Sequence, residues 1–316
     1  MELKPVIPFE PISSDRIPAG DRWIYQIKWD GVRMLMYRDS SGIRLINRKR
    51  NVRTAQYPEF HPFDLACDAD TFILDGEMIA FDDSKPSFHE VMKRDGLRRT
   101  GSIEAAVKRI PVVYMVFDIL FHNGEWTINR TLEERQKLLR SVLKTGPLVQ
   151  LTESFPDGEA LFEAMKARQM EGIVCKDLDS AYALDGKDGR WVKRKISRDL
   201  YAAIGGVTYK DGRANALLLG LYAEDGRFVY VGHAGPGKLA HAEWTRFVRR
   251  LLEAPLERMP FANRPERIKD AEWTIPRLVV KVHYLERTPG GTMRHPTVQA
   301  VMDAMSPGEC RLDQLL

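Results

Sequence analysis

The chain has 316 residues, of which 44% are hydrophobic and 29% charged, the composition of an ordinary globular protein. Its net charge of +4 is small, so the total charge permits a nucleic-acid partner without requiring one. Cys67, Cys175 and Cys310 are far apart and form no CxxC pair. This pattern argues against a disulfide framework or a zinc site and favours a reducing compartment.

The N-terminal region has prolines and charged residues but no apolar segment typical of an export signal. Elsewhere, no apolar run approaches the ~18 residues that a membrane-spanning helix needs. We therefore expect a soluble protein that is not exported and has no membrane partner. The length is sufficient for two domains.

Residues 1–20 contain several prolines and are expected to form an extended arm or loop. Alternating or continuous apolar runs then predict strands, and Ser/Thr-x-x-Glu patterns predict helix starts. The expected strands are Trp23–Lys28, Val32–Tyr37, Ile43–Asn47, Phe72–Phe81, Val112–Phe121 and a short one over 190–195. The expected helices are 87–92, 131–144 and 158–169. Few helices among many strands indicate an α+β domain.

The pattern changes after Ser197, where three strand-like segments follow one another with tight turns. These are Tyr201–Tyr209, Ala216–Tyr222 and Phe228–Gly232, followed by a helix over 238–253 and a strand over 277–284. Such an order suits a small Greek-key β-barrel of the OB-fold type. We therefore place a domain boundary near residues 196–200.

Charged residues interrupt several of the strand-like segments. Asp75 and Glu77 share one face of their strand, and Asp118 is the single acid in an apolar run. Buried charges are costly unless they bind something, so these acids are candidates for a site. A basic cluster, Arg48-Lys49-Arg50, admits two interpretations, a solvated loop or a contact for phosphates.

Lys28 and Asp30 are two residues apart, so both side chains leave the same face of an extended segment. Gly31 follows and permits a sharp turn or the close approach of another group. Two interpretations fit these residues alone. One is a nucleophilic lysine with an acidic partner, and the other is a strand end with an exposed ion pair.

Polar residues within the strand-like segments form one ordered series along the chain. It runs Lys28-Trp-Asp30-Gly31, Arg48, Asp75-Gly-Glu77, Phe117-Asp118, Glu171-Gly-x-Val-x-Lys176 and Trp191-x-Lys193-x-Lys195. This series resembles the covalent nucleotidyltransferase superfamily of ATP-dependent DNA ligases, RNA ligases and capping enzymes. The form Lys-Trp-Asp-Gly-Val-Arg, with the late run Tyr284–Pro296, is most similar to bacterial non-homologous end-joining ligases.

The resemblance implies a mixed or antiparallel-sheet nucleotidyltransferase (adenylation) domain over residues 1–198 and an OB-fold domain over 199–316. It makes Lys28 the nucleophile that attacks the α-phosphate of ATP, forming a lysyl-AMP and releasing pyrophosphate. Asp30, Lys193 and Lys195 are the other implied catalytic residues. Nearby lysines and a divalent metal are expected to disfavour the protonated form of Lys28 and to oppose charge on the phosphates.

The resemblance also implies two sets of binding residues. The nucleotide would be bound by Gln26, Ile27, Arg33, Arg48, Glu77, Phe117, Lys176, Lys193 and Lys195. Within this set, Phe117 would stack on adenine and Glu77 would accept hydrogen bonds from the ribose. Carboxylate oxygens suit Mg²⁺ or Mn²⁺, and Glu77 and Glu171 are the expected metal ligands.

The implied function is ATP-dependent DNA ligation in repair by end joining, on nicked or broken double-stranded DNA. The implied setting is the bacterial cytoplasm at the nucleoid, with a monomeric enzyme and a bacterial Ku protein as partner. Two alternatives stay open. One is an RNA ligase of the same superfamily, and the other is a catalytically weak nucleic-acid-binding module.

One motif departs from the resemblance. End-joining ligases continue the late run into an Arg-x-Asp-Lys motif thought to orient the pyrophosphate, whereas this chain has Met302, Ala304 and Met305 in that register. Arg294 and Lys281 are the basic residues that would have to compensate. Formation of the lysyl-AMP is therefore expected to be slow or to use another basic residue.

Overall fold

In the computed structural model of the protein, the described residues are 2–61, 67–82, 85–237 and 239–315. The chain divides into two compact units, Met1–Ile196 and Ser197–Leu316. Among the described residues, no helix has the length and apolarity to cross a membrane. Each unit is described by itself below.

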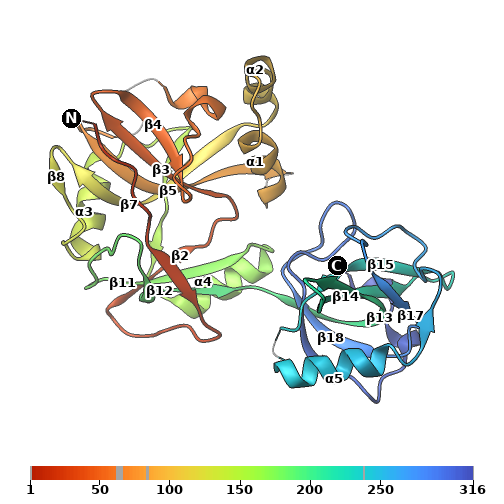
Figure 1. The fold of residues 1–316 in the computed structure, drawn as a ribbon. Coiled ribbons are helices and arrows are strands. Elements are labelled where there is room, and N and C mark those ends of the chain that lie inside the picture. The colour runs from red at the N-terminus through yellow and green to blue at the C-terminus, as the bar shows by residue number, and fades with distance from the viewer. Residues whose placement is uncertain (1, 62–66, 83–84, 238, 316) are drawn as a thin grey trace. The chain divides into compact units, whose positions relative to one another are not determined.

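The larger sheet of the first unit has the order β4-β3-β5-β7-β8, with β6 beside β5 and β9 beside β7 (Figure 1). Its strands are β3 (Val32–Asp39), β4 (Gly42–Asn47), β5 (Phe72–Asp82), β6 (Lys85–Pro86), β7 (Val112–His122), β8 (Glu125–Trp126) and β9 (Val149–Leu151). β7 is the continuous apolar run of the sequence, and it is buried because the sheet has packed layers on both faces.

The smaller sheet of the first unit has the order β1-β12-β11-β2-β10. Its strands are β1 (Glu10–Ser13), β2 (Trp23–Ile27), β10 (Ser154–Phe155), β11 (Gly172–Asp177) and β12 (Lys187–Lys195). Residues 1–20 were expected to form an extended arm or loop; within them β1 is extended, but it also pairs in parallel with β12, which was not predicted. Pro11 cannot donate to a ladder, but an edge strand tolerates it.

Four helices belong to the first unit: α1 (Phe88–Asp95), α2 (Thr100–Arg109), α3 (Leu132–Val142) and α4 (Gly158–Ala167). At the start of α1 the Ser87 hydroxyl accepts a hydrogen bond from the Glu90 amide, and α3 begins with a full Thr131–Glu134 capping box. α1 extends beyond its expected end. α2 was not predicted, and neither were the short 3₁₀ turns Thr54–Gln56 and Pro58–Phe60.

The two sheets of the first unit pack face to face, and the cluster between them includes Leu35, Ile73, Phe117 and Trp191. Residues of α1 and α3 pack on the outer face of the larger sheet, while α4 packs on the outer face of the smaller one (Figure 1). Side chains that alternate along β12 therefore face either the space between the sheets or α4.

The second unit is one curled sheet of β13 (Arg198–Lys210), β14 (Arg213–Tyr222), β15 (Phe228–Ala234), β16 (Pro255–Leu256), β17 (Glu272–Thr274), β18 (Val279–Tyr284) and β19 (Thr297–Val301). β13 pairs with β14, β17 and β18, and its register shifts at Ile204/Gly206, which bends the sheet. α5 (His241–Leu251) buries Trp244, Phe247, Val248 and Leu251 against this sheet. Two short 3₁₀ turns, Pro307–Glu309 and Leu312–Gln314, lie near the C-terminal end.

Candidate active site

A pocket in the first unit brings together residues from both sheets and from the N-terminal strand. Its lining is Glu10, Pro11, Gln26, Ile27, Lys28, Trp29, Arg33, Arg48, Glu77, Phe117, Val174, Lys176, Trp191 and Lys193. Nine of these were expected at a nucleotide site from the sequence. Glu10, Pro11, Trp29, Val174 and Trp191 were not among the expected site residues.

Lys28 lies just after β2, on a segment held closely against two other strands. Its backbone amide donates to the Gly172 carbonyl at 2.9 Å. A Cβ on Gly31 would lie 2.3 Å from the Met78 carbonyl oxygen, and one on Gly172 would lie 2.2 Å from the Arg194 carbonyl oxygen. Both glycines are therefore required by close backbone approach: Gly31 brings the lysine segment against β5, and Gly172 brings β11, which accepts the Lys28 amide, against β12.

A single carboxylate bridges two of the expected catalytic lysines. Glu171 Oε2 accepts from Lys28 Nζ at 2.5 Å, and Glu171 Oε1 lies 2.9 Å from Lys195 Nζ. Although burial would raise the pKa of Glu171, Lys28 and Lys195 hold that pKa below its ordinary value. The group that contacts Lys28 Nζ is therefore a carboxylate, whereas the sequence had led us to expect cations around it.

Lys176 is buried in the pocket between two aromatic rings. Its side chain is 2% exposed, and its Nζ lies 4.2 Å from the Phe117 ring centroid and 3.9 Å from that of Trp191. This Nζ has no hydrogen-bond partner among the described residues. Burial lowers the pKa of Lys176 to about 7. A buried amine without an acceptor is suited to an anion that enters the pocket.

Glu77 also lines the pocket. Burial is the main reason that the pKa of Glu77 is raised to about 8; the charges of Lys28 and Arg33 oppose the rise, and the charge of Glu171 adds to it. No cluster of three or more metal-type side chains occurs among the described residues. Mg²⁺ needs only one or two carboxylates when phosphates and water complete its shell, so Glu77 and Glu171 fit such an ion.

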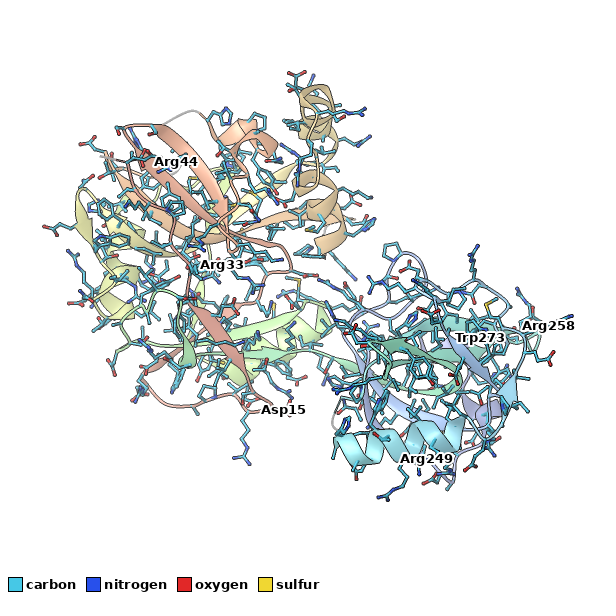
Figure 2. The ribbon with its side chains drawn as sticks, in the orientation of Figure 1. Asp15, Arg33, Arg44, Arg249, Arg258 and Trp273 are labelled. Carbon is cyan, nitrogen blue, oxygen red and sulfur yellow. The ribbon has the colours of Figure 1, made fainter. Side chains whose placement is uncertain are left out.

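Arg33 lies between the two sheets of the first unit (Figure 2). Its guanidinium makes a bidentate pair with Asp75, at 2.5 and 2.6 Å, and stands 4.5 Å from the Phe117 ring centroid. Asp75 also accepts from the Tyr182 hydroxyl at 2.7 Å. The acid in the middle of β5 is thus satisfied by protein partners, and it holds Arg33 against the aromatic wall of the pocket.

Arg48 and Gln26 line the pocket, and each has a protein partner. Arg48 pairs at 2.9 Å with Glu10 of β1, and Gln26 Nε2 donates to the Ser154 hydroxyl at 3.0 Å. Lys193 lies on β12, and burial, followed by the charge of Lys195, lowers its pKa. β12 has β1 and β11 on its two sides, so these lysines are not on an edge strand.

Four expected acids, Asp30, Asp75, Asp118 and Glu171, are not among the lining residues, although Glu171 contacts Lys28, which is. Asp118 pairs with Arg135 of α3 at 2.8 Å, and both side chains are fully buried. Asp118 therefore has a structural partner, and this pair joins β7 to α3.

The late motif lies in the second unit. Met302 and Met305 pack against the apolar core of that unit. The two basic residues considered as substitutes are both ion-paired, Arg294 with Glu286 at 2.7 Å and Lys281 with Asp199 at 2.9 Å.

The sequence matches the family of the ATP dependent DNA ligase domain over residues 13–195 and the ATP dependent DNA ligase C terminal region over residues 210–303. The chain belongs to the ATP-dependent DNA ligase family. The superfamily resemblance seen in the motifs is thereby confirmed.

Several relatives of this ligase-family chain are known. It is 28% identical over 296 residues to the multifunctional non-homologous end joining protein LigD of Mycolicibacterium smegmatis, covering 91% of this chain and 37% of that protein. It is 29% identical over 245 residues to DNA ligase C2 of the same organism, covering 75% of this chain and 68% of that protein. The chain thus spans little more than a third of the LigD proteins that it matches.

Solved structures give the same result for this member of the ligase family. The mycobacterial DNA ligase D complexed with ATP and MES matches with a TM-score of 0.54 and 26% identity, over 96% of this chain and 97% of that one. A Lig E DNA ligase matches with a TM-score of 0.60 at 16% identity, over 89% of this chain and 93% of that one, which shows the fold alone. The predicted fold class, a nucleotidyltransferase domain followed by an OB-fold-like domain, is confirmed.

Proposed function

We propose that this protein is an ATP-dependent DNA ligase that forms a lysyl-AMP on Lys28. The observation that carries the proposal is the pocket itself. It gathers a lysine held by Glu171, a buried and unpartnered Lys176, and an aromatic wall formed by Phe117 and Trp191. A nucleoside phosphate supplies a matching group for each, namely an electrophilic phosphorus, an anionic oxygen and a flat base.

In the first step, Lys28 Nζ attacks the α-phosphorus of ATP, so a P–N bond forms and the bond to pyrophosphate breaks. Lys28 must lose its proton, and Glu171 at 2.5 Å is the acceptor within reach. Lys176, Lys193 and Lys195 oppose the negative charge that grows on the phosphate oxygens. Phe117 stacks on adenine, and Glu77 accepts from a ribose hydroxyl.

In the second step, an oxygen of the DNA 5′-phosphate attacks the same phosphorus, the P–N bond breaks, and Lys28 regains a proton. In the third step the 3′-hydroxyl attacks the 5′-phosphate, AMP leaves, and the hydroxyl proton goes to solvent. Arg48 holds the 5′-phosphate, and Arg33 supports the pocket wall through Asp75.

Glu77 and Glu171 would hold the Mg²⁺ or Mn²⁺ ion, whose charge would weaken the bond to the leaving pyrophosphate. In the absence of the ion, Glu171 neutralises Lys28 and Lys195, and burial favours the protonated form of Glu77. Of the two carboxylates that would bind the ion, Glu171 is therefore also the group that pairs with the lysines of the pocket.

We further propose that the first unit is the adenylation domain and the second an OB-fold domain that contacts DNA. Likeness to end-joining LigD proteins supports a role in bacterial end-joining repair, with nicked or broken DNA as substrate. A bacterial Ku protein, a monomeric state and a cytoplasmic location at the nucleoid belong to the same proposal.

The test is intact-mass measurement after incubation with ATP and Mg²⁺. We expect a covalent AMP adduct on the wild type and none on Lys28→Ala. The lysyl-AMP mechanism would be contradicted if the wild type formed no adduct, or if Lys28→Ala still formed one. Parallel assays on nicked DNA and nicked RNA distinguish a DNA ligase from an RNA ligase.

A second candidate, a catalytically weak nucleic-acid-binding module, is favoured by one observation. Met302 and Met305 pack against the core of the second unit, where the resemblance implies a basic motif that acts in lysine adenylylation. A nick that already carries the 5′-adenylate bypasses that step. We expect such a nick to be sealed faster than one that depends on ATP, whereas a mere binding module would seal neither.

A further inference from the structure

A tight turn after β4 carries consecutive basic residues at the rim of the pocket. We call residues 48–52 (Arg48-Lys49-Arg50-Asn51-Val52) the basic turn. Arg48 lines the pocket. All five residues are exposed, and Val52 is 59% exposed, the most of any large hydrophobic side chain in the described residues.

The basic turn is held in shape by Asn47. Its side-chain oxygen accepts from the amides of Lys49 and Asn51, both at 3.0 Å. Its backbone carbonyl accepts from the Arg50 amide at 2.8 Å, and its amide donates to the Asn51 carbonyl at 3.0 Å. The turn is therefore a fixed element, and its side chains lose little backbone freedom when they bind.

Two cations of the basic turn are not engaged by the protein. Arg48 pairs with Glu10, whereas neither Lys49 nor Arg50 has an acidic partner within 4.0 Å among the described residues. Arg50 also has a φ of 62°, in the left-handed region where glycine is favoured. An arginine is unfavourable in this backbone conformation, so the conformation of the turn does not explain why residue 50 is an arginine.

We propose that Lys49 and Arg50 bind backbone phosphates of the DNA strand whose 5′-phosphate enters the pocket. These phosphates are the ones next to the reacting phosphate. The inference rests on the proposed function. Because Arg48 lines the pocket and the exposed Lys49 and Arg50 follow it directly in the same turn, a strand whose phosphate enters the pocket can also reach them. The exposed Val52 offers an apolar contact to the sugar faces between phosphates.

Phosphates beyond the reacting one distinguish DNA from ATP. ATP has no phosphate beyond its own three, whereas a DNA strand continues past the reacting phosphate. Lys49 and Arg50 are therefore expected to affect DNA binding and its salt dependence, and to leave the affinity for ATP unchanged. A binding role for the ATP phosphates is the competing outcome.

The test measures the dissociation constant of the full chain for a nicked duplex at several salt concentrations, without ATP. The test variant is Lys49→Ala/Arg50→Gly, in which glycine suits the backbone of residue 50. The matched control is Lys108→Ala/Arg109→Ala, which removes the same charge from two exposed residues at the end of α2. Thermal unfolding of each variant reports whether the fold is intact.

Each phosphate contact contributes about 0.9 to the slope of log affinity against log salt, so the test variant should lose about 1.8 of slope. Between 50 and 200 mM salt, wild-type affinity should then fall about 12-fold more than that of the variant. The control should keep the wild-type slope. Arg50→Lys, which keeps the charge, should recover most of the loss seen in Arg50→Gly.

An unchanged slope in the test variant, an equal fall in the control, or a raised KM for ATP in adenylylation would overturn the proposal. Failure of the proposed function is a separate result. It would appear as a wild type that forms no AMP adduct, and the binding comparison would still decide whether Lys49 and Arg50 contact DNA.

Discussion

Replacing Lys176 with methionine should stabilise the first unit while removing nucleotide transfer. The ammonium is buried without a hydrogen-bond acceptor, and its pKa is about 7 against an ordinary 10.5. The folded protein therefore binds this proton less tightly than the unfolded chain does. This penalty is fully present below pH 7 and disappears as the pH rises towards the unfolded value.

With about 1.36 kcal/mol per pKa unit, the penalty is roughly 4 kcal/mol at pH 7 and roughly 2 kcal/mol at pH 9. These are upper values, because attraction to the rings of Phe117 and Trp191 stabilises the buried ammonium by up to about 2 kcal/mol and reduces the penalty by that amount. Methionine has a similar length and needs no acceptor. Lys176→Met should thus be more stable than the wild type at pH 7, and its advantage should shrink at pH 9.

The assay is urea unfolding at both pH values, with hydrogen exchange of β11 peptides to assign the transition to the first unit. The control is Lys108→Met, where an exposed lysine is replaced and neither pH should show a gain. A Lys176→Met protein that is no more stable than the wild type at pH 7, or whose gain grows with pH, would refute the reasoning. AMP-adduct formation should be lost in Lys176→Met, because the phosphate loses its buried cation.

Three further changes test other parts of the structure. Asp118→Asn leaves a buried Arg135 without its counter-charge and should cost about 3–5 kcal/mol of unfolding free energy. Gly31→Ala places a Cβ 2.3 Å from the Met78 carbonyl oxygen, so it should displace the lysine segment and slow adenylylation strongly. Glu77 has a pKa of about 8, so its ionised fraction and the apparent Mg²⁺ affinity should rise about fivefold from pH 7 to pH 8.

Urea unfolding, single-turnover AMP-adduct formation and Mg²⁺ titration of adenylylation are the respective measurements. An Asp118→Asn protein as stable as the wild type would contradict the buried-pair argument. If Gly31→Ala forms the AMP adduct at the wild-type rate, then the backbone near Met78 can move to accept the Cβ without displacing Lys28, which would contradict the argument. In Glu77→Gln, the apparent Mg²⁺ affinity should not rise from pH 7 to pH 8. If it still rises, a group other than Glu77 is responsible for the pH dependence.

The sequence was informative about the pocket because lysine chemistry on a phosphate needs particular residue types. Lys28, Glu77, Phe117 and Lys176 come from separate strands, yet each carries its chemistry in its own side chain. Their order along the chain resembles that of the covalent nucleotidyltransferases, and this resemblance predicted that they meet. A local pattern does not say which charges pair, so the contact of Lys28 with Glu171 was not foreseen.

Asp118 illustrates the limit of reasoning from polar residues in apolar strands. A buried acid requires a partner, but the requirement is met equally by a ligand or by Arg135 on the following helix. The segment around Glu10 was missed for a different reason. With a proline beside it, the segment has no strand pattern of its own and becomes a strand only by pairing with β12.

The pairing of β1 with β12 also has a consequence for how the protein is made. β1 lies near the start of the chain and β12 at the end of the first unit, so Ile12 meets Val192 and Ser13 meets Lys193. Contacts between such distant residues form late and slowly, because a long loop must close first. During synthesis, the wall that contains Glu10 and Pro11 can be completed only after nearly the whole first unit has left the ribosome. Nucleotide binding would therefore report that this unit has finished folding.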